Sequence, residues 1–187
     1  MTKKLSGIIK GELEIKGDLE LTGDLTVEKW IEVSGSINCN GYSIKAGYSI
    51  KAGGSIEAGD SIEAGGSIEA GYSIEAGGSI EAGYSIKAGD SIEASGSIKA
   101  GGSILAQLWV KAKTTIKARL YIYVGMVTWR EYQEGDDLIE CSKLVSGEVK
   151  YGKLVETGET KETIKIGNNT YDKDEVENAL KNVKSID

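Results

Sequence analysis

A six-residue repeat runs through most of the chain and constrains its fold more than any other feature. Between residues 44 and 106 the motif is Ser-Ile-x-Ala-Gly-x, in which an isoleucine recurs every six residues from Ile44 to Ile104 and an alanine follows two residues after each. A looser aliphatic pair at i and i+2 precedes the motif from Leu13 and follows it to Val124, which gives about nineteen units. A period of six excludes an amphipathic helix, whose apolar face recurs every 3.6 residues.

Each unit has the pattern of a short strand followed by a corner. Residues at i and i+2 of a strand lie on the same face, so the Ile–Ala pair faces a common core. Glycines such as Gly47 and Gly53 follow each pair, where we expect a corner with dihedral angles that glycine adopts most readily. We therefore predict an all-β fold, a single-stranded parallel β-helix (β-solenoid) whose coils stack about 4.8 Å apart.

The outward residue between each Ile and Ala indicates how many units form one coil. A coil of three units gives two columns in which the charge changes sign, and a third that repels itself. The first two are Lys45, Glu63, Glu81 and Lys99, and Lys51, Glu69 and Lys87; the third is Glu57, Glu75 and Glu93. A coil of two units gives a column of glutamates only: Glu57, Glu69, Glu81 and Glu93. Because like charges on neighbouring strands repel, the pattern favours three sides, with about six coils over the repeats.

One irregularity interrupts the repeat. The spacing between Ile37 and Ile44 is seven residues, and we expect the extra residue to form a corner bulge at Asn40-Gly41. Cys39 takes the place of the alanine, which predicts a small buried hydrophobic residue. With Cys141 it makes neither a zinc-ligand spacing nor a disulfide framework, so we expect a reducing compartment.

The chain is expected to have three parts. Residues 1–124 form the solenoid with an N-terminal cap, residues 125–155 a β-rich cap, and residues 156–187 a hairpin followed by an amphipathic helix, so that the C-terminal cap is α+β. Strands are predicted at 138–141 and 148–151, and a hairpin at 163–171. Candidate residues for cap or oligomer contacts are Trp109, Trp129, Val176, Leu180 and Val183.

Composition argues against catalysis and against several classes of partner. The chain has 26 glycines but no histidine, which removes the usual general base and the commonest metal ligand. Its carboxylates lie on a convex wall, whereas acid–base catalysis needs a cleft. We predict no enzyme activity, cofactor or metal. The net charge of −7 disfavours direct binding to nucleic acid or to an anionic membrane. No apolar stretch suits a signal peptide or a membrane span, so a cytoplasmic location is expected.

The central repeats carry a run of acidic residues. Between Lys51 and Lys87 there is no other basic residue, and six acids are the candidate partner-binding set: Glu57, Asp60, Glu63, Glu69, Glu75 and Glu81. Tyr72 and Tyr84 replace glycine at corners and are candidate anchors for a partner. A regular row of carboxylates can imitate the charge spacing of a nucleic acid duplex. The alternative interpretation is a solvated face that limits aggregation.

Several families share this kind of repeat. Hexapeptide acyltransferases have the same period, but they use a catalytic histidine that is missing here. The Gly-Asp-Leu-x-Leu-x and Ser-Ile-x-Ala-Gly-x units resemble those of bactofilins, which form polymers of β-helices. They are more similar to uncharacterised proteins of phages and mobile elements, in which such a run leads to a segment similar to residues 118–152. That resemblance implies a phage or mobile-element origin and no known activity.

Three functional hypotheses follow. The first is a non-enzymatic phage or mobile-element interaction protein, an inhibitor of a host defence system that binds a host protein or protein complex through its acidic rod in the bacterial cytoplasm. The second is a bactofilin-like structural polymer, which a bulky C-terminal cap would hinder. The third is an acyltransferase-like enzyme, which the missing histidine disfavours. A homo-oligomer is compatible with the first two hypotheses.

Overall fold

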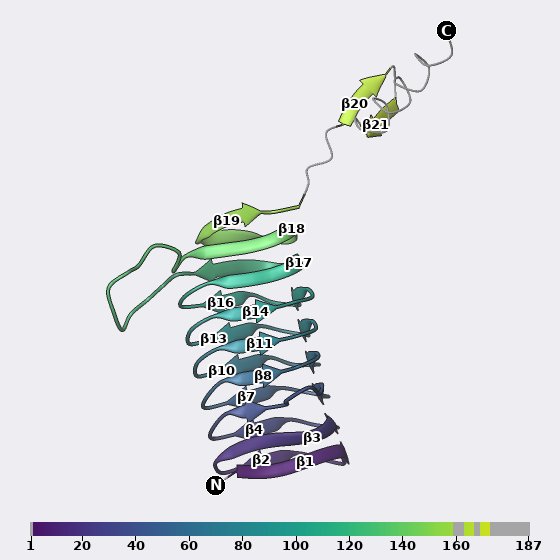
Figure 1. The fold of residues 1–187 in the computed structure, drawn as a ribbon, viewed down its shortest axis with the longest axis vertical. Helices are drawn as coiled ribbons and strands as arrows, with labels where there is room; N and C mark the ends of the chain where they lie inside the picture. The colour runs from purple at the N-terminus through teal and green to yellow at the C-terminus, as the bar shows by residue number, and fades with distance from the viewer. Residues whose placement is uncertain (1, 159–162, 167–168, 173–187) are drawn as a thin grey trace. The chain divides into compact units, whose positions relative to one another are not determined.

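The chain folds into a parallel β-solenoid followed by a second, smaller unit. The computed structural model describes residues 2–158, 163–166 and 169–172. The first unit is Met1–Thr157 and the second is Gly158–Asp187. In the first unit every strand pairs with its neighbours in parallel, and the coils stack as a ladder (Figure 1). The prediction of an all-β solenoid is confirmed.

The solenoid has three sides, each a stack of short parallel strands. Side 1 consists of β2 (Leu13–Ile15), β4 (Ile31–Val33), β7 (Ile50–Ala52), β10 (Ile68–Ala70), β13 (Ile86–Ala88) and β16 (Ile104–Ala106). It ends with the last residues of the two long strands β17 (Val110–Val124) and β18 (Leu138–Tyr151).

Side 2 contains the start of β1 (Thr2–Ile9), the start of β3 (Asp18–Val27), β5 (Ile37–Asn38), β8 (Ile56–Ala58), β11 (Ile74–Ala76), β14 (Ile92–Ala94) and the start of β17. Beyond β17 it continues with the start of β18 and with β19 (Lys153–Glu156). Side 3 contains the ends of β1 and β3, β6 (Ile44–Ala46), β9 (Ile62–Ala64), β12 (Ile80–Ala82), β15 (Ile98–Ala100) and the middle segments of β17 and β18.

The pairing register confirms the three-sided coil. Ile62 pairs with Ile44 and with Ile80, so one coil is 18 residues long. The column Lys45, Glu63, Glu81 and Lys99 therefore exists as predicted. The expected number of about six coils is too small, because β1 adds a level before the repeats and β18 and β19 add levels after them. Side 2 consequently has nine levels.

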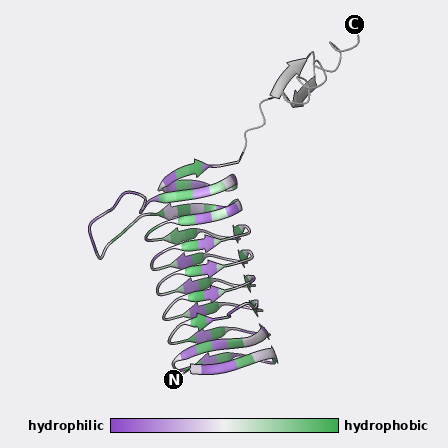
Figure 2. Cartoon of the chain, viewed as in Figure 1, coloured by the Kyte–Doolittle hydropathy of each residue, from purple (hydrophilic) through white to green (hydrophobic). Residues whose placement is uncertain are grey.

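The core is a narrow stack of aliphatic residues. In every regular strand the first and third residues are buried and the middle one faces outward, which Figure 2 shows as alternating hydrophobic and hydrophilic residues. The isoleucines of the regular motif have no exposed surface, while the alanines near the corners retain a few per cent. Fully burying such an isoleucine side chain contributes roughly 1.5–3 kcal/mol, so the stacked columns dominate the stability of the solenoid.

The corner glycines are required for a different reason from the one expected. Gly47, Gly53 and Gly59 do not have positive φ angles, so left-handed dihedrals do not explain them. A Cβ atom at Gly53 would instead collide with the carbonyl oxygen of Ser34 in the preceding coil. At Gly47, Gly53 and Gly59 the backbones of successive corners approach so closely that a Cβ atom would collide with the preceding coil.

The predicted bulge lies where the repeat is one residue longer. Leu25 pairs with Ile44, an offset of 19 residues instead of 18. Asn40 has a φ of 49° in the left-handed region, which asparagine tolerates better than most residues. The Asn40 side-chain amide donates a hydrogen bond of 2.8 Å to the backbone oxygen of Leu21, which fixes the bulge to the coil beneath it.

Residues 125–155 do not form a separate cap with its own arrangement of strands. The two predicted strands lie within the single strand β18, which stacks in parallel on β17 as the next coil. Register shifts along this pair hide the six-residue period, which explains why the sequence pattern fails after Gly125. Only the loop between Gly125 and Asp137 leaves the coil, and it does so at the corner between side 1 and side 2 (Figure 1).

The second unit contains the predicted hairpin. Strands β20 (Thr163–Ile166) and β21 (Asn169–Asp172) pair in antiparallel orientation, with Ile166 opposite Asn169. The predicted C-terminal helix, with Val176, Leu180 and Val183, lies outside the described residues. In the described part of the chain, no helix has the length and hydrophobicity needed to cross a membrane.

Candidate partner-binding site

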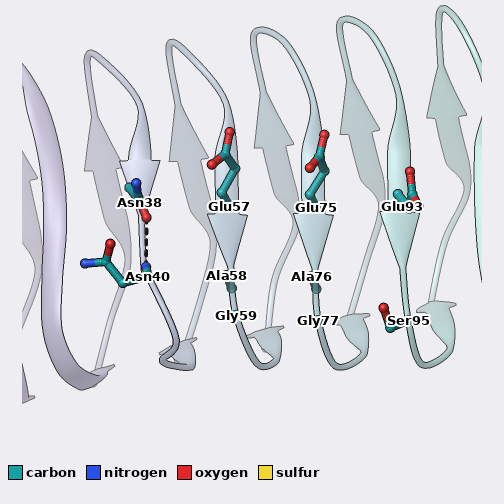
Figure 3. Close-up of a pocket in the computed structure, with 10 residues that line it drawn as sticks. All are labelled: Asn38, Asn40, Glu57, Ala58, Gly59, Glu75, Ala76, Gly77, Glu93 and Ser95. Carbon is teal, nitrogen blue, oxygen red and sulfur yellow. Dashed lines mark hydrogen bonds between the residues drawn. The ribbon is translucent and has the colours of Figure 1, made fainter.

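The most distinctive surface feature is a ladder of three glutamates on side 2. Glu57, Glu75 and Glu93 are the outward residues of β8, β11 and β14, which pair in direct register. Figure 3 shows the three side chains side by side on successive coils. Neighbouring strands are about 4.8 Å apart, so the carboxylates form a row of like charges at that spacing. We call these three residues the acidic ladder.

The acidic ladder lies in a shallow groove along side 2. The groove has a volume of about 310 Å³, and the backbones of corner residues such as Gly59 and Gly77 form its wall. Asn38 and Asn40 line one end and Ser95 lines the other. The side-chain oxygen of Asn38 accepts a hydrogen bond of 2.8 Å from the backbone N–H of Asn40, which orders that end.

The electrostatics of the ladder are unfavourable without a partner. Partial burial raises the pKa of Glu75 above its ordinary value, and the charges of Glu57 and Glu93 on either side raise it further. Within the described residues, no ion pair neutralises any of the three carboxylates. The levels that flank the ladder differ. Asn38 precedes Glu57 and Lys111 follows Glu93, and the Nζ of Lys111 lies 3.8 Å from a carboxylate oxygen of Glu140 one level further on.

The structure separates the six acids that are consecutive in the sequence. Glu57 and Glu75 share side 2, but Glu63 and Glu81 lie on side 3, where they pair with Lys45 and Lys99. Glu69 is on side 1, stacked between Lys51 and Lys87. Asp60 lies at a corner and accepts a hydrogen bond of 2.9 Å from the Ser43 hydroxyl. The predicted acidic run therefore winds around the solenoid and does not form one face.

The predicted aromatic contacts lie at different places on the solenoid. Tyr72 and Tyr84 are 60% and 68% exposed at two different corners. Trp109 directly precedes β17, and the Nζ of Lys111 lies 5.9 Å from the centroid of its ring. Trp109 is not at the end of the solenoid, because β18 and β19 stack beyond β17. Trp129 is exposed in the loop after Gly125 and stacks with Arg130.

Sequence reasoning missed part of the site. The column of Glu57, Glu75 and Glu93 follows from the three-sided coil as predicted, but Glu93 was not in the candidate partner-binding set because Lys87 ends the acidic run before it. Asn38, Asn40 and Ser95 were also missed as lining residues. An 18-residue spacing connects Asn38, Glu57, Glu75 and Glu93 once the inserted residue is taken into account, and this spacing is the signal that could have found them.

The loop between β17 and β18 is held by a buried ion pair. Asp136 is 4% exposed and accepts two hydrogen bonds from the Arg130 guanidinium, at 2.7 and 2.8 Å, and one from the backbone N–H of Gln133 at 2.6 Å. The hydrogen bonds from Arg130 are the main reason why the pKa of Asp136 is lowered. Such a bidentate pair fixes the geometry of the loop.

The described residues offer little for catalysis. No group of three or more potential metal ligands lies within them. Cys39 is buried, and desolvation raises the pKa of its thiol to about 12, so it is not a nucleophile at neutral pH. Cys141 is also buried, and burial raises the pKa of its thiol.

Comparison with known proteins gives one family. Residues 11–183 match the family model described as FapA, the flagellar assembly protein A β-solenoid domain. No curated protein and no solved structure matches the chain. The match does not support the phage or mobile-element origin that the resemblance of the repeats implied.

Proposed function

Because the chain belongs to the family of the flagellar assembly protein A β-solenoid domain, we propose that it is a non-enzymatic scaffold with a role in flagellar assembly. This family is not a known enzyme family. The observation that carries this role is the family match over residues 11–183. The acidic ladder in the groove of side 2, which has no ion pair among the described residues, is the surface that we propose binds the partner. The packed aliphatic core fixes the three outward carboxylates in a row on the surface. A fixed row of charges on an open surface favours binding of another protein over catalysis of a reaction.

The ladder favours a partner segment that carries lysine or arginine side chains. A cation placed between Glu57, Glu75 and Glu93 replaces repulsion between like charges with attraction. Binding of a basic side chain at this position therefore lowers the electrostatic energy of the ladder. The carboxylates are solvent-accessible, so salt should weaken the interaction strongly. The partner of this proposal is a protein of the flagellar assembly with a basic segment.

The test uses complementation in a flagellated organism that carries the gene. Deletion of the gene is expected to reduce flagella per cell and swimming in soft agar. A triple variant of the ladder (Glu57→Lys, Glu75→Lys and Glu93→Lys) should fail to restore them. The matched control reverses three exposed charges away from the ladder (Glu14→Lys on side 1, and Glu131→Lys and Glu134→Lys in the loop between β17 and β18) and should restore both.

Two results would contradict the proposal in different ways. Normal flagellation after deletion would exclude the role in flagellar assembly. Full restoration by the ladder variant, at wild-type protein level and with wild-type circular dichroism, would exclude the acidic ladder as the binding surface and leave the role itself standing.

A further inference from the structure

The corner between side 3 and side 1 carries a ridge of large exposed residues on alternate coils. Tyr48, Tyr84 and Leu120 are 61%, 68% and 51% exposed. Backbone hydrogen bonds stack this corner in the order Tyr48, Gly66, Tyr84, Gly102 and Leu120. Each large residue is thus followed one coil later by a glycine, and the ridge has gaps at Gly66 and Gly102.

The charge on side 3 changes sign along the solenoid next to this ridge. Its outward residues in successive coils are Glu63, Glu81, Lys99 and Lys117. The charge changes from negative to positive on the other sides of these coils as well. Residues 52–86 contain acids but no bases, and residues 94–130 contain bases but no acids. On side 3, two acidic coils (Glu63 and Glu81) are therefore followed by two basic coils (Lys99 and Lys117), and the sign changes between Glu81 and Lys99. Lys45 lies in the coil before Glu63 and pairs with it.

We propose that two copies of the chain pair through side 3 and this ridge, in antiparallel orientation. The two-fold axis lies between the coils of Glu81 and Lys99 and is perpendicular to the solenoid axis. It reverses the order of coils, so Glu81 faces Lys99 of the partner subunit and Glu63 faces Lys117 of the partner subunit. Each pair occurs twice, because a two-fold interface is isologous.

The same axis fits the ridge to itself. It places Tyr84 over the gap at Gly102 of the partner subunit and Leu120 over the gap at Gly66 of the partner subunit. Aromatic and aliphatic residues buried in this way are the usual anchors of an interface, while the exposed ion pairs fix its orientation. A parallel pair would instead set Glu81 against Glu81 and Lys99 against Lys99, which like charges disfavour.

Nothing in the described solenoid blocks this surface. The loop between β17 and β18 leaves at the corner between side 1 and side 2, which is opposite side 3. Lys45, Glu63, Glu81 and Lys99 are each about half exposed, and their ion pairs within the chain leave carboxylate oxygens free to accept from a second copy. The acidic ladder on side 2 remains accessible, so pairing does not depend on the proposed function.

A charge-swap experiment tests the pairing. Light scattering after size-exclusion chromatography at low salt should give twice the 19.8 kDa mass of the chain. The variant Glu63→Lys with Glu81→Lys should be monomeric, and so should Lys99→Glu with Lys117→Glu. An equimolar mixture of the two variants should again give the doubled mass, because every pair across the interface is then of opposite charge.

The control and the contradicting outcomes are equally specific. Glu57→Lys with Glu75→Lys changes two charges on side 2 and should leave the wild-type dimer intact. A wild-type mass of 19.8 kDa would overturn the proposal. So would dimers of either swap variant alone, a mixture that stays monomeric, or large species whose mass grows with concentration, which would indicate stacking end to end.

Discussion

At the scale of single residues, the isoleucine of each unit contributes most to the core and the outward residue contributes most to the surface. Ile74 has no exposed surface and stacks between Ile56 and Ile92. One position further along the strand, Glu75 stacks between two other glutamates. Neighbouring residues of one short strand therefore act on stability in opposite directions.

Truncation of a core isoleucine should strongly destabilise the solenoid. We expect Ile74→Ala to lower the free energy of unfolding by about 2–5 kcal/mol, because it leaves a cavity between two coils that cannot collapse. Ile8→Ala is the control, since Ile8 is 77% exposed. Both are measured by denaturant unfolding followed by circular dichroism. Equal stability of the two variants would contradict the stacked core.

Removal of the central charge of the ladder should stabilise the fold at neutral pH. The pKa of Glu75 is raised in the folded state, so its ionisation disfavours folding as the pH rises through the ordinary value of 4.5. Glu75→Gln should therefore melt at a higher temperature than the wild type at pH 7, and the difference should vanish below pH 4.5. Glu81→Gln is the control and should not gain stability, because Glu81 pairs with Lys99. A gain independent of pH would contradict the repulsion.

At the scale of elements, the corners and the one long loop determine what each coil can carry. A corner glycine such as Gly89 lies so close to Gly71 of the preceding coil that no side chain fits between them. The loop between β17 and β18 is the exception, because an ion pair and not a neighbouring coil holds it.

An added methyl group should therefore be tolerated at one corner and not at another. We expect Gly89→Ala to destabilise the solenoid by several times more than Gly41→Ala, since a Cβ at Gly89 would collide with the Gly71 carbonyl oxygen and a Cβ at Gly41 meets nothing within 4 Å. Thermal unfolding of the two variants measures the difference. A Gly89→Ala protein as stable as the wild type would show that the corners can separate.

Loss of the buried carboxylate should open the loop without unfolding the coils. Asp136→Ala leaves the Arg130 guanidinium without its bidentate partner, so we expect faster trypsin cleavage after Arg130 and a shifted fluorescence of Trp129. The melting temperature of the solenoid should change little. Glu134→Ala, which removes an exposed carboxylate from the same loop, is the control. Unchanged cleavage of Asp136→Ala would exclude the ion pair as the element that holds the loop.

The sequence predicted the regular elements well and the irregular ones poorly. Strict repetition from Ile44 to Ala106 determines both the strand positions and the 18-residue coil, so the core and its outward columns follow from the pattern. The coil formed by β18 was missed because register shifts against β17 conceal its period. The column of Glu57, Glu75 and Glu93 followed from the 18-residue coil, but the candidate surface was taken from the acidic run, whose neighbours in sequence lie on different sides.

At the scale of the whole solenoid, strands form both ends of the described first unit. β1 pairs only with β3, and the segment Lys143–Tyr151 of β18 pairs only with β17 among the described residues. Such edges are templates for further strands, which keeps a bactofilin-like polymer as the alternative to a scaffold that pairs through side 3. The two arrangements use different surfaces, so the charge swap on side 3 separates them.

The 18-residue coil is the claim on which the acidic ladder and the two-fold pairing both depend, and spin labels test it directly. In a background of Cys39→Ala and Cys141→Ala, one variant carries labels at Glu57→Cys and Glu75→Cys, and another at Glu57→Cys and Glu69→Cys. Strong dipolar broadening is predicted for the first pair, whose strands are neighbours about 4.8 Å apart, and none of that strength for the second, whose residues lie on different sides. Stronger broadening in the second pair would indicate a 12-residue coil and would contradict the three-sided solenoid.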